Sequence, residues 1–194
     1  MFILPCRARC AGEPWSVPMR LTRFEITYPV PSASIAVFSS KVCRVEVIRA
    51  RWSDLPLLLR HPLLQQAATY LLGGIDPLTG EFHLYNGEGG KLPSRLPDHR
   101  RNPARAFVET LYILTSDAFD KTDVVYLQER LSTLIQEAGT VRLVQGCGPT
   151  SQPISAAKAE ELDMVLHFGL QLLEQAGCPG LQALPSALPH LRVA

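Results

Sequence analysis

Alternating apolar and polar residues predict a series of short β-strands in the first 115 residues of the chain. A turn containing Asp76, Pro77 and Gly80 separates two of these runs and predicts a connected strand pair. Another run, AFVETLYILTS, is rich in aromatic and β-branched residues, which are typical of strands. The strand pair consists of ATYLLGG and EFHLYNG. The other strand-like runs are FEITYPV, SIAVF, CRVEVIRA and the later VRLVQG.

Apolar residues at helical spacing predict two long helices in the second half of the chain. The clearer one covers residues 121–138 and ends before Gly139, a residue type that often terminates helices. The other is SAAKAEELDMVLHFGLQLLEQAG, near the end. Two short helices are expected at SDLPLLLRHPLL, capped by Ser53, and at KLPSRLPDH, where Pro97 weakens the middle.

These elements predict an α+β fold with a small three-stranded antiparallel sheet flanked by helices. Its strands are expected near residues 68–73, 82–86 and 107–114, with the 121–138 helix packed on them. An N-terminal β extension and a long C-terminal helix complete the expected fold. We divide the chain into a leader, a β-rich extension, a central domain, a helical extension and a tail: residues 1–18, 19–65, 66–146, 147–178 and 179–194.

The leader and the tail offer no periodic apolar face to bury, so we expect both to be disordered and dispensable for stability. Met19 stands at the expected domain start, so either Met1 or Met19 serves as the first residue.

Composition permits one domain with a substantial core, because 46% of the 194 residues are hydrophobic. The formal net charge of +1 gives the whole molecule no general attraction for nucleic acid, so any such attraction is local. No apolar run approaches the roughly 20 residues of a membrane span. The five cysteines are odd in number and lack a CxxC pair, which indicates reduced thiols in a cytoplasmic protein.

A basic segment follows the predicted strand pair. It runs from Lys91 to Arg105 and contains five basic residues and one acid, Asp98. Such a segment either contacts phosphates or forms a solvated basic helix face. Arg95 and His99 stand four residues apart and would share one face of a helix.

The segment LYNGEGG, residues 84–90, is either only a hairpin turn or the edge of a site built around Tyr85. Asn-Gly is typical of a hairpin turn, but alternation continues on its N-terminal side only, so we expect a flexible turn into a short basic helix. The following GEGGK is not a phosphate-binding P-loop, because that motif requires glycine where Tyr85 stands and Ser or Thr where Leu92 stands.

Several of these segments together resemble a GIY-YIG nuclease domain: ATYLLGG, then LYNGEGG about 15 residues later, then Arg95 and His99, then VVYLQERL on a helix. The flanking segments SKVCRVEVIRARWSDLPLLL and PTSQPISAAKAEELDMVLHFGLQLL are similar to those of a bacterial subgroup of uncharacterised GIY-YIG proteins. The resemblance covers about residues 22–177.

The resemblance implies roles for individual residues. Tyr70 and Tyr85 match the tyrosines of the two name-giving motifs, with Gly87 as the second motif's glycine. Arg95 matches the phosphate-contacting arginine, and His99 a histidine one turn later. The implied chemistry is hydrolysis of a DNA phosphodiester with Mg²⁺ or Mn²⁺. The residues expected to contact DNA are Lys91, Arg95, Arg100 and Arg101.

The metal-binding position departs from the family pattern, because Gln128 stands where the family has glutamate. The neighbouring Glu129 points away from the apolar stripe of its helix, so we expect it to face solvent. A neutral amide is a poor ligand for Mg²⁺, which favours anionic oxygen.

Three hypotheses about function stay open. The first is a metal-dependent DNA endonuclease with a substitute ligand. The second is an inactive module of the same fold that binds nucleic acid or a protein. The third is an unrelated small-molecule enzyme. In the first two, Tyr70, Tyr85, Arg95 and Gln128 should converge on one concave surface.

Overall fold

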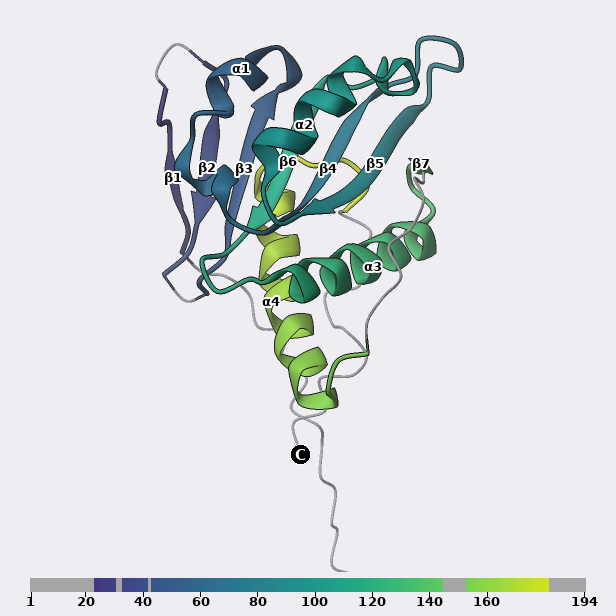
Figure 1. Cartoon of the computed structure of the whole chain (residues 1–194). Coiled ribbons are helices and arrows are strands. Elements are labelled where there is room, and N and C mark those ends of the chain that lie inside the picture. Colours follow the sequence, from purple (N-terminus) through teal and green to yellow (C-terminus); the bar gives the residue numbers. More distant parts are fainter. Residues whose placement is uncertain (1–22, 31–32, 42, 145–152, 182–194) are drawn as a thin grey trace, which may run out of the picture.

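The computed structural model describes residues 23–30, 33–41, 43–144 and 153–181, which form a layered α+β fold around one sheet (Figure 1). The predicted leader and residues 182–194 of the predicted tail lie outside the described residues. The strands are β1 Glu25–Thr27, β2 Ala36–Ser39, β3 Glu46–Arg51, β4 Ala68–Ile75, β5 Phe82–Gly89, β6 Thr110–Thr115 and β7 Arg142–Val144. The helices are α1 Leu55–Leu58, α2 Leu92–Arg101, α3 Lys121–Ala138 and α4 Ala156–Gln175. Three short 3₁₀ turns are η1 Trp52–Asp54, η2 Pro62–Gln65 and η3 Pro103–Arg105.

The sheet has seven strands in the order β1-β2-β3-β6-β4-β5-β7, so the predicted small three-stranded antiparallel sheet is wrong. The three predicted strands are β4, β5 and β6, and β4 does pair antiparallel with both others. However, β3 pairs with β6 along its whole length, so the strands assigned to an extension continue the same sheet. At the other edge β7 adds a parallel partner to β5, which makes the sheet mixed.

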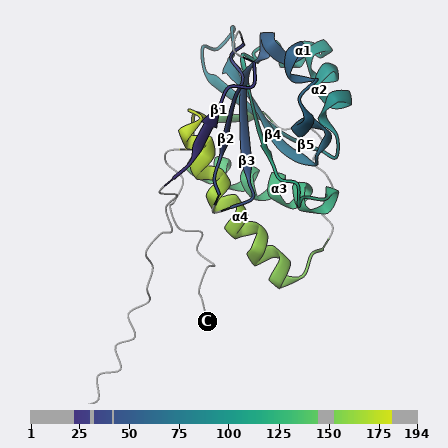
Figure 2. The same ribbon diagram turned by 90° about the vertical axis from the view of Figure 1, so that its left-hand side faces the viewer.

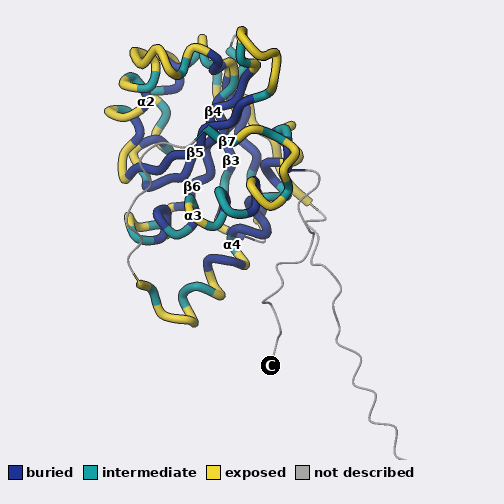
Figure 3. The backbone as a smooth tube through the Cα atoms, turned by 90° about the vertical axis from the view of Figure 1, so that its right-hand side faces the viewer, coloured by how far each residue is buried: buried dark blue, intermediate teal, exposed yellow. Residues whose placement is uncertain are grey.

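Helices cover both faces of the sheet, and side-chain alternation along each strand assigns residues to one face or the other. On one face Tyr70 and Leu72 of β4 pack with Leu92 and Leu96 of α2; we call this the α2 face. On the other, Leu84 of β5 packs with α3 and α4; we call this the α3 face. Figure 2, turned by 90°, shows α1 and α2 together on one side of the strands. Figure 3 shows that the strands are mostly buried between exposed outer turns of the helices.

The predicted helix at residues 121–138 is confirmed as α3. Its start is fixed by a capping box, in which Asp120 and Asp123 each accept a hydrogen bond from the other's backbone N–H. Its end is fixed by Gly139, whose φ of 61° is a left-handed conformation that favours glycine. The basic helix is confirmed as α2, which continues through Pro97.

None of the helices in the described ranges combines the length and apolar content that a membrane crossing requires. Two of the five cysteines, Cys43 and Cys178, lie in the described residues, where both are buried free thiols.

Candidate functional site

The two motif tyrosines lie on the α2 face because of strand register. Tyr70 of β4 stands opposite Gly87 of β5, and Tyr85 precedes Gly87 by two residues, so the two tyrosine side chains project to the same face. Leu92 and Leu96 anchor α2 above them in the same core. The expected turn at Asn86–Gly87 is therefore wrong: both residues lie inside β5, which continues to Gly89.

Glycine is required at position 87 because the Tyr70 side chain packs directly against its backbone, and not because of a turn. A Cβ atom at Gly87 would lie 2.5 Å from the Tyr70 ring and hydroxyl, whereas one at Gly90 would meet no atom within 4 Å. We therefore expect Gly87→Ala to lower the free energy of unfolding by about 1–3 kcal/mol, as overpacking does. Gly90→Ala is the matched control and should change stability by less than about 0.5 kcal/mol. Equal chemical denaturation curves for the two variants would contradict this packing.

Four predicted site residues meet on the α2 face. The Tyr70 hydroxyl lies 2.6 Å from His99 Nε2 and accepts a hydrogen bond of 3.1 Å from Arg95 Nε. The Tyr85 ring lies beside both other rings, with centroids 5.0 Å from His99 and 6.4 Å from Tyr70. Residues from β4, β5 and α2 thus form one hydrogen-bonded aromatic cluster that carries a guanidinium group.

Burial fixes the protonation of this cluster. Burial, followed by the nearby charges of Arg105 and Arg95, lowers the pKa of His99 to about 4, so its imidazole is neutral at pH 7. Burial also raises the pKa of Tyr70, which therefore keeps its proton. Because Arg95 donates to the Tyr70 oxygen, the Tyr70 O–H donates to unprotonated His99 Nε2. The positive charge of the cluster then resides on arginine.

A fifth member, Arg105 of η3, was counted in the basic segment but not predicted as a site residue. Its guanidinium carbon lies 4.0 Å from the centroid of the Tyr85 ring, a cation–π contact. Its Nε is buried without a hydrogen-bond partner among the described residues. The side chain of Asn102 accepts a hydrogen bond from Ala104 N and holds η3 directly after α2. We call Tyr70, Tyr85, Arg95, His99 and Arg105 the arginine–tyrosine site.

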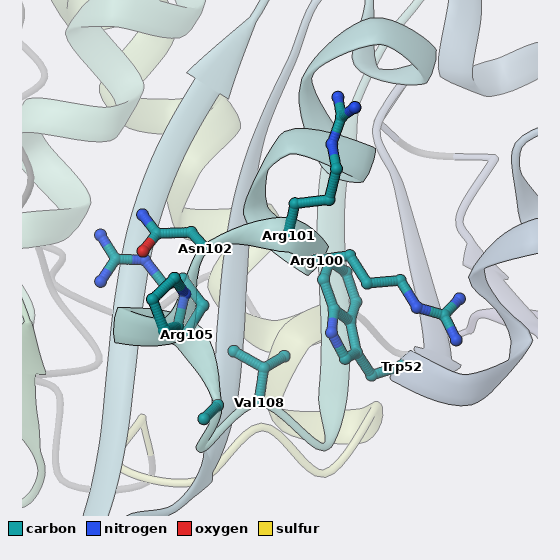
Figure 4. A pocket seen from close by; sticks show the side chains of 8 residues that line it. Trp52, Arg100, Arg101, Asn102, Arg105 and Val108 are labelled. Carbon is teal, nitrogen blue, oxygen red and sulfur yellow. The ribbon is translucent and has the colours of Figure 1, made fainter.

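The other predicted DNA-contacting residues are exposed on or beside α2. Arg101 is ion-paired with Asp98 one turn earlier. Arg100 forms no ion pair within the described part of the chain and lines a pocket with Trp52 (Figure 4). Lys91 immediately precedes the helix.

Gln128 lies on the opposite side of the sheet. Its Nε2 donates to the Asn86 backbone oxygen at 3.1 Å, and Asn86 Nδ2 donates to the Gln128 backbone oxygen at 2.8 Å. Asn86 follows Tyr85 directly in β5, so their side chains point to opposite faces. The structure therefore separates Gln128 from the three residues with which we expected it to converge. Glu129 is exposed, as predicted.

The donors around Gln128 do not fit a Mg²⁺ or Mn²⁺ site. Gln128 Oε1 is a neutral amide oxygen that is buried without a hydrogen-bond partner among the described residues. The Asn86 amide, which donates to the Gln128 backbone oxygen and to the Ser132 hydroxyl, is also neutral, whereas Mg²⁺ favours anionic oxygen. Glu88, two residues along β5, is ion-paired with Lys121. Within the described residues no group of three or more His, Cys, Asp or Glu side chains is arranged to hold a metal ion.

Comparison of the chain with known protein families, with curated proteins and with solved structures finds no match.

Proposed function

We propose that the arginine–tyrosine site binds a phosphodiester of DNA, and that the chain is a DNA-binding module that hydrolyses its ligand slowly or not at all. The observation that supports this most strongly is the arrangement of Arg95 and Arg105 around the rings of Tyr70, Tyr85 and His99. The resemblance of the same residues to GIY-YIG motifs supports DNA as the ligand.

The charge of the site favours an anion. Among the described residues, only the Tyr70 hydroxyl accepts a hydrogen bond from Arg95, and no acidic side chain is paired with Arg95 or Arg105. A guanidinium group presents several N–H donors in one plane and matches two oxygens of a phosphate.

The surrounding surface extends the site along α2. Arg100 and Arg101 are exposed on the helix that carries Arg95, and Lys91 is exposed immediately before it, so more than one backbone phosphate can be contacted at once. This arrangement gives a near-neutral protein a local basic surface, without requiring attraction over the whole molecule.

The acid–base groups of the site are poorly suited to rapid hydrolysis. A general base works best when its pKa lies near the working pH. The pKa of His99, about 4, makes its imidazole a weak base at pH 7, and the raised pKa of Tyr70 disfavours a phenolate. Slow hydrolysis is the second candidate function, favoured by the 2.6 Å contact of Tyr70 with His99, through which a proton can move.

DNA binding is tested by fluorescence anisotropy with labelled single-stranded and duplex oligonucleotides. We expect binding that weakens steeply between about 50 and 200 mM salt, as it does when phosphates displace condensed counterions. The absence of binding to either oligonucleotide at about 50 mM salt would contradict the proposal.

Binding should also strengthen in mild acid. A bound phosphate offsets the charges of Arg105 and Arg95, which help to lower the pKa of His99, and therefore raises that pKa above about 4. Affinity then rises as the pH falls through the pKa of the complex, because the complex takes up a proton that the free protein does not. His99→Gln should remove this component when affinities are measured between pH 7 and pH 5.

The loss of folding stability in acid limits the pH range over which DNA affinities can be compared. Because the pKa of folded His99 is lowered from 6.5, the unfolded chain binds more protons, and stability falls as the pH drops below 6.5. Circular dichroism at each pH is the control. Identical pH profiles for the natural protein and His99→Gln, with both folded, would contradict a phosphate beside His99.

A further inference from the structure

Two adjoining hollows lie beside the arginine–tyrosine site, at the C-terminal end of α2. They have volumes of about 320 and 480 Å³, and both are lined by Trp52, Arg100 and Val108. Figure 4 shows the indole of Trp52 below the helix that carries Arg100 and Arg101, with Arg105 on the other side of the hollow. We call this the Trp52 pocket.

The pocket combines an aromatic surface with cationic side chains. The hollow drawn in Figure 4 is lined by Arg100, Arg101 and Arg105, and no acidic residue lines it. The adjoining hollow adds Arg51 and one acid, Glu109. An indole face together with guanidinium groups is the combination on which nucleobases stack in proteins that bind single strands.

The position of Trp52 is fixed by the backbone. The Trp52 backbone N–H donates to the Glu109 backbone oxygen at 2.7 Å, immediately beyond the β3–β6 ladder. The Trp52 side chain packs partly against the core of the α2 face. A ring held in this way loses little freedom when a ligand stacks on it.

Arg105 links the pocket to the arginine–tyrosine site. It lines the pocket while its guanidinium lies over the Tyr85 ring, and its Nε is buried without a hydrogen-bond partner among the described residues. A DNA strand with a phosphate between Arg95 and Arg105 therefore has its neighbouring nucleotide next to the pocket.

We propose that the Trp52 pocket binds an unpaired nucleobase of the DNA strand whose phosphodiester lies at the arginine–tyrosine site. This inference rests on the proposed function. The base stacks on the Trp52 indole, and Arg100 and Arg101 offer donors to its ring nitrogens and carbonyl oxygens. A base inside a duplex is stacked on both faces and cannot enter, so the preferred ligand is single-stranded DNA or DNA with an unpaired nucleotide.

Two labelled oligothymidylates of equal length test this inference, one intact and one in which the central nucleotides are abasic. The backbone charge is the same in both, so a difference in their Kd values reports contact with bases. The full chain has two tryptophans, Trp15 and Trp52, so a Trp15→Phe background assigns the fluorescence to Trp52. We expect the intact strand to bind about tenfold more tightly and to quench Trp52 fluorescence.

Trp52→Ala should lower the affinity for the intact strand to that for the abasic one. Because Trp52 also packs against the core, Trp52→Phe is the second variant and should retain part of the preference while preserving the fold. Equal binding of the two strands, or unchanged Trp52 fluorescence while DNA is bound, would overturn the base pocket and leave the phosphodiester proposal standing. Binding of neither strand would instead reject the proposed function, and the pocket with it.

Discussion

The double substitution Arg95→Ala and Arg105→Ala should weaken DNA binding by about 100- to 10,000-fold at low salt. Each guanidinium is expected to form a charged hydrogen bond to a phosphate, which contributes about 1.5–3 kcal/mol, and each 1.4 kcal/mol changes Kd tenfold. The magnitude of the slope of log affinity against log salt should fall by about one for each arginine removed. Fluorescence anisotropy over a range of salt concentrations measures both quantities.

Lys41→Ala is the matched control for this prediction. Lys41 is exposed and ion-paired with Glu25 of β1, at the sheet edge farthest from β5, so its removal takes away one charge without touching the site. Arg95→Lys should give an intermediate affinity, because it keeps the charge but loses the planar set of donors. A loss no greater than that caused by Lys41→Ala would contradict binding at the arginine–tyrosine site.

Gln128→Glu should destabilise the protein and should not create rapid Mg²⁺-dependent cleavage of DNA. The substitution replaces the Nε2 donor that bonds the Asn86 backbone oxygen with a carboxylate, which cannot donate. Leaving a buried acceptor without its donor lowers the free energy of unfolding by about 1–3 kcal/mol. The new carboxylate lies on the α3 face, separated by the sheet from Tyr70, Tyr85 and Arg95.

Gln136→Glu makes the same chemical change at an exposed position of α3 and should alter stability by less than about 0.5 kcal/mol. Thermal unfolding and plasmid cleavage with Mg²⁺ or Mn²⁺ compare the two variants with the natural protein. Brisk cleavage by Gln128→Glu, but not by Gln136→Glu, would place a working metal site beside residue 128. Brisk cleavage by the natural protein would overturn the proposal of slow or absent hydrolysis.

Local signals in the sequence predicted the elements that build the site. The apolar stripe and Gly139 marked α3, and the alternating runs marked β4, β5 and β6. The spacing of Arg95 and His99 placed both on one face of α2, where they contact Tyr70. Each of these predictions depends on residues close together in the chain or on a helical period.

Pairings between distant segments were not predictable in the same way. A two-residue alternation shows that a run is a strand but not which strand it pairs with, so the β3–β6 ladder was missed and the sheet was expected to have three strands instead of seven. The helical wheel placed Glu129 away from the apolar stripe of α3, and Glu129 is exposed. It could not show that Gln128 meets Asn86, on the side of the sheet opposite Tyr85.

Arg105 and Trp52 were not singled out from the sequence, and the reason differs between them. Arg105 follows the predicted helix in a 3₁₀ turn, and its contact with the Tyr85 ring depends on how η3 folds back. Trp52 stands in no motif, and the role proposed for it depends on its position beside the end of α2, which is set by tertiary packing.

Backbone amide chemical shifts of the natural protein, recorded by NMR during titration with a short single-stranded DNA, test the central claim most directly. Binding at the arginine–tyrosine site predicts the largest perturbations in β5 near Tyr85 and in residues 91–105, with smaller changes in α3 and α4. Perturbations concentrated in α3 and α4, with β5 and α2 unchanged, would contradict it.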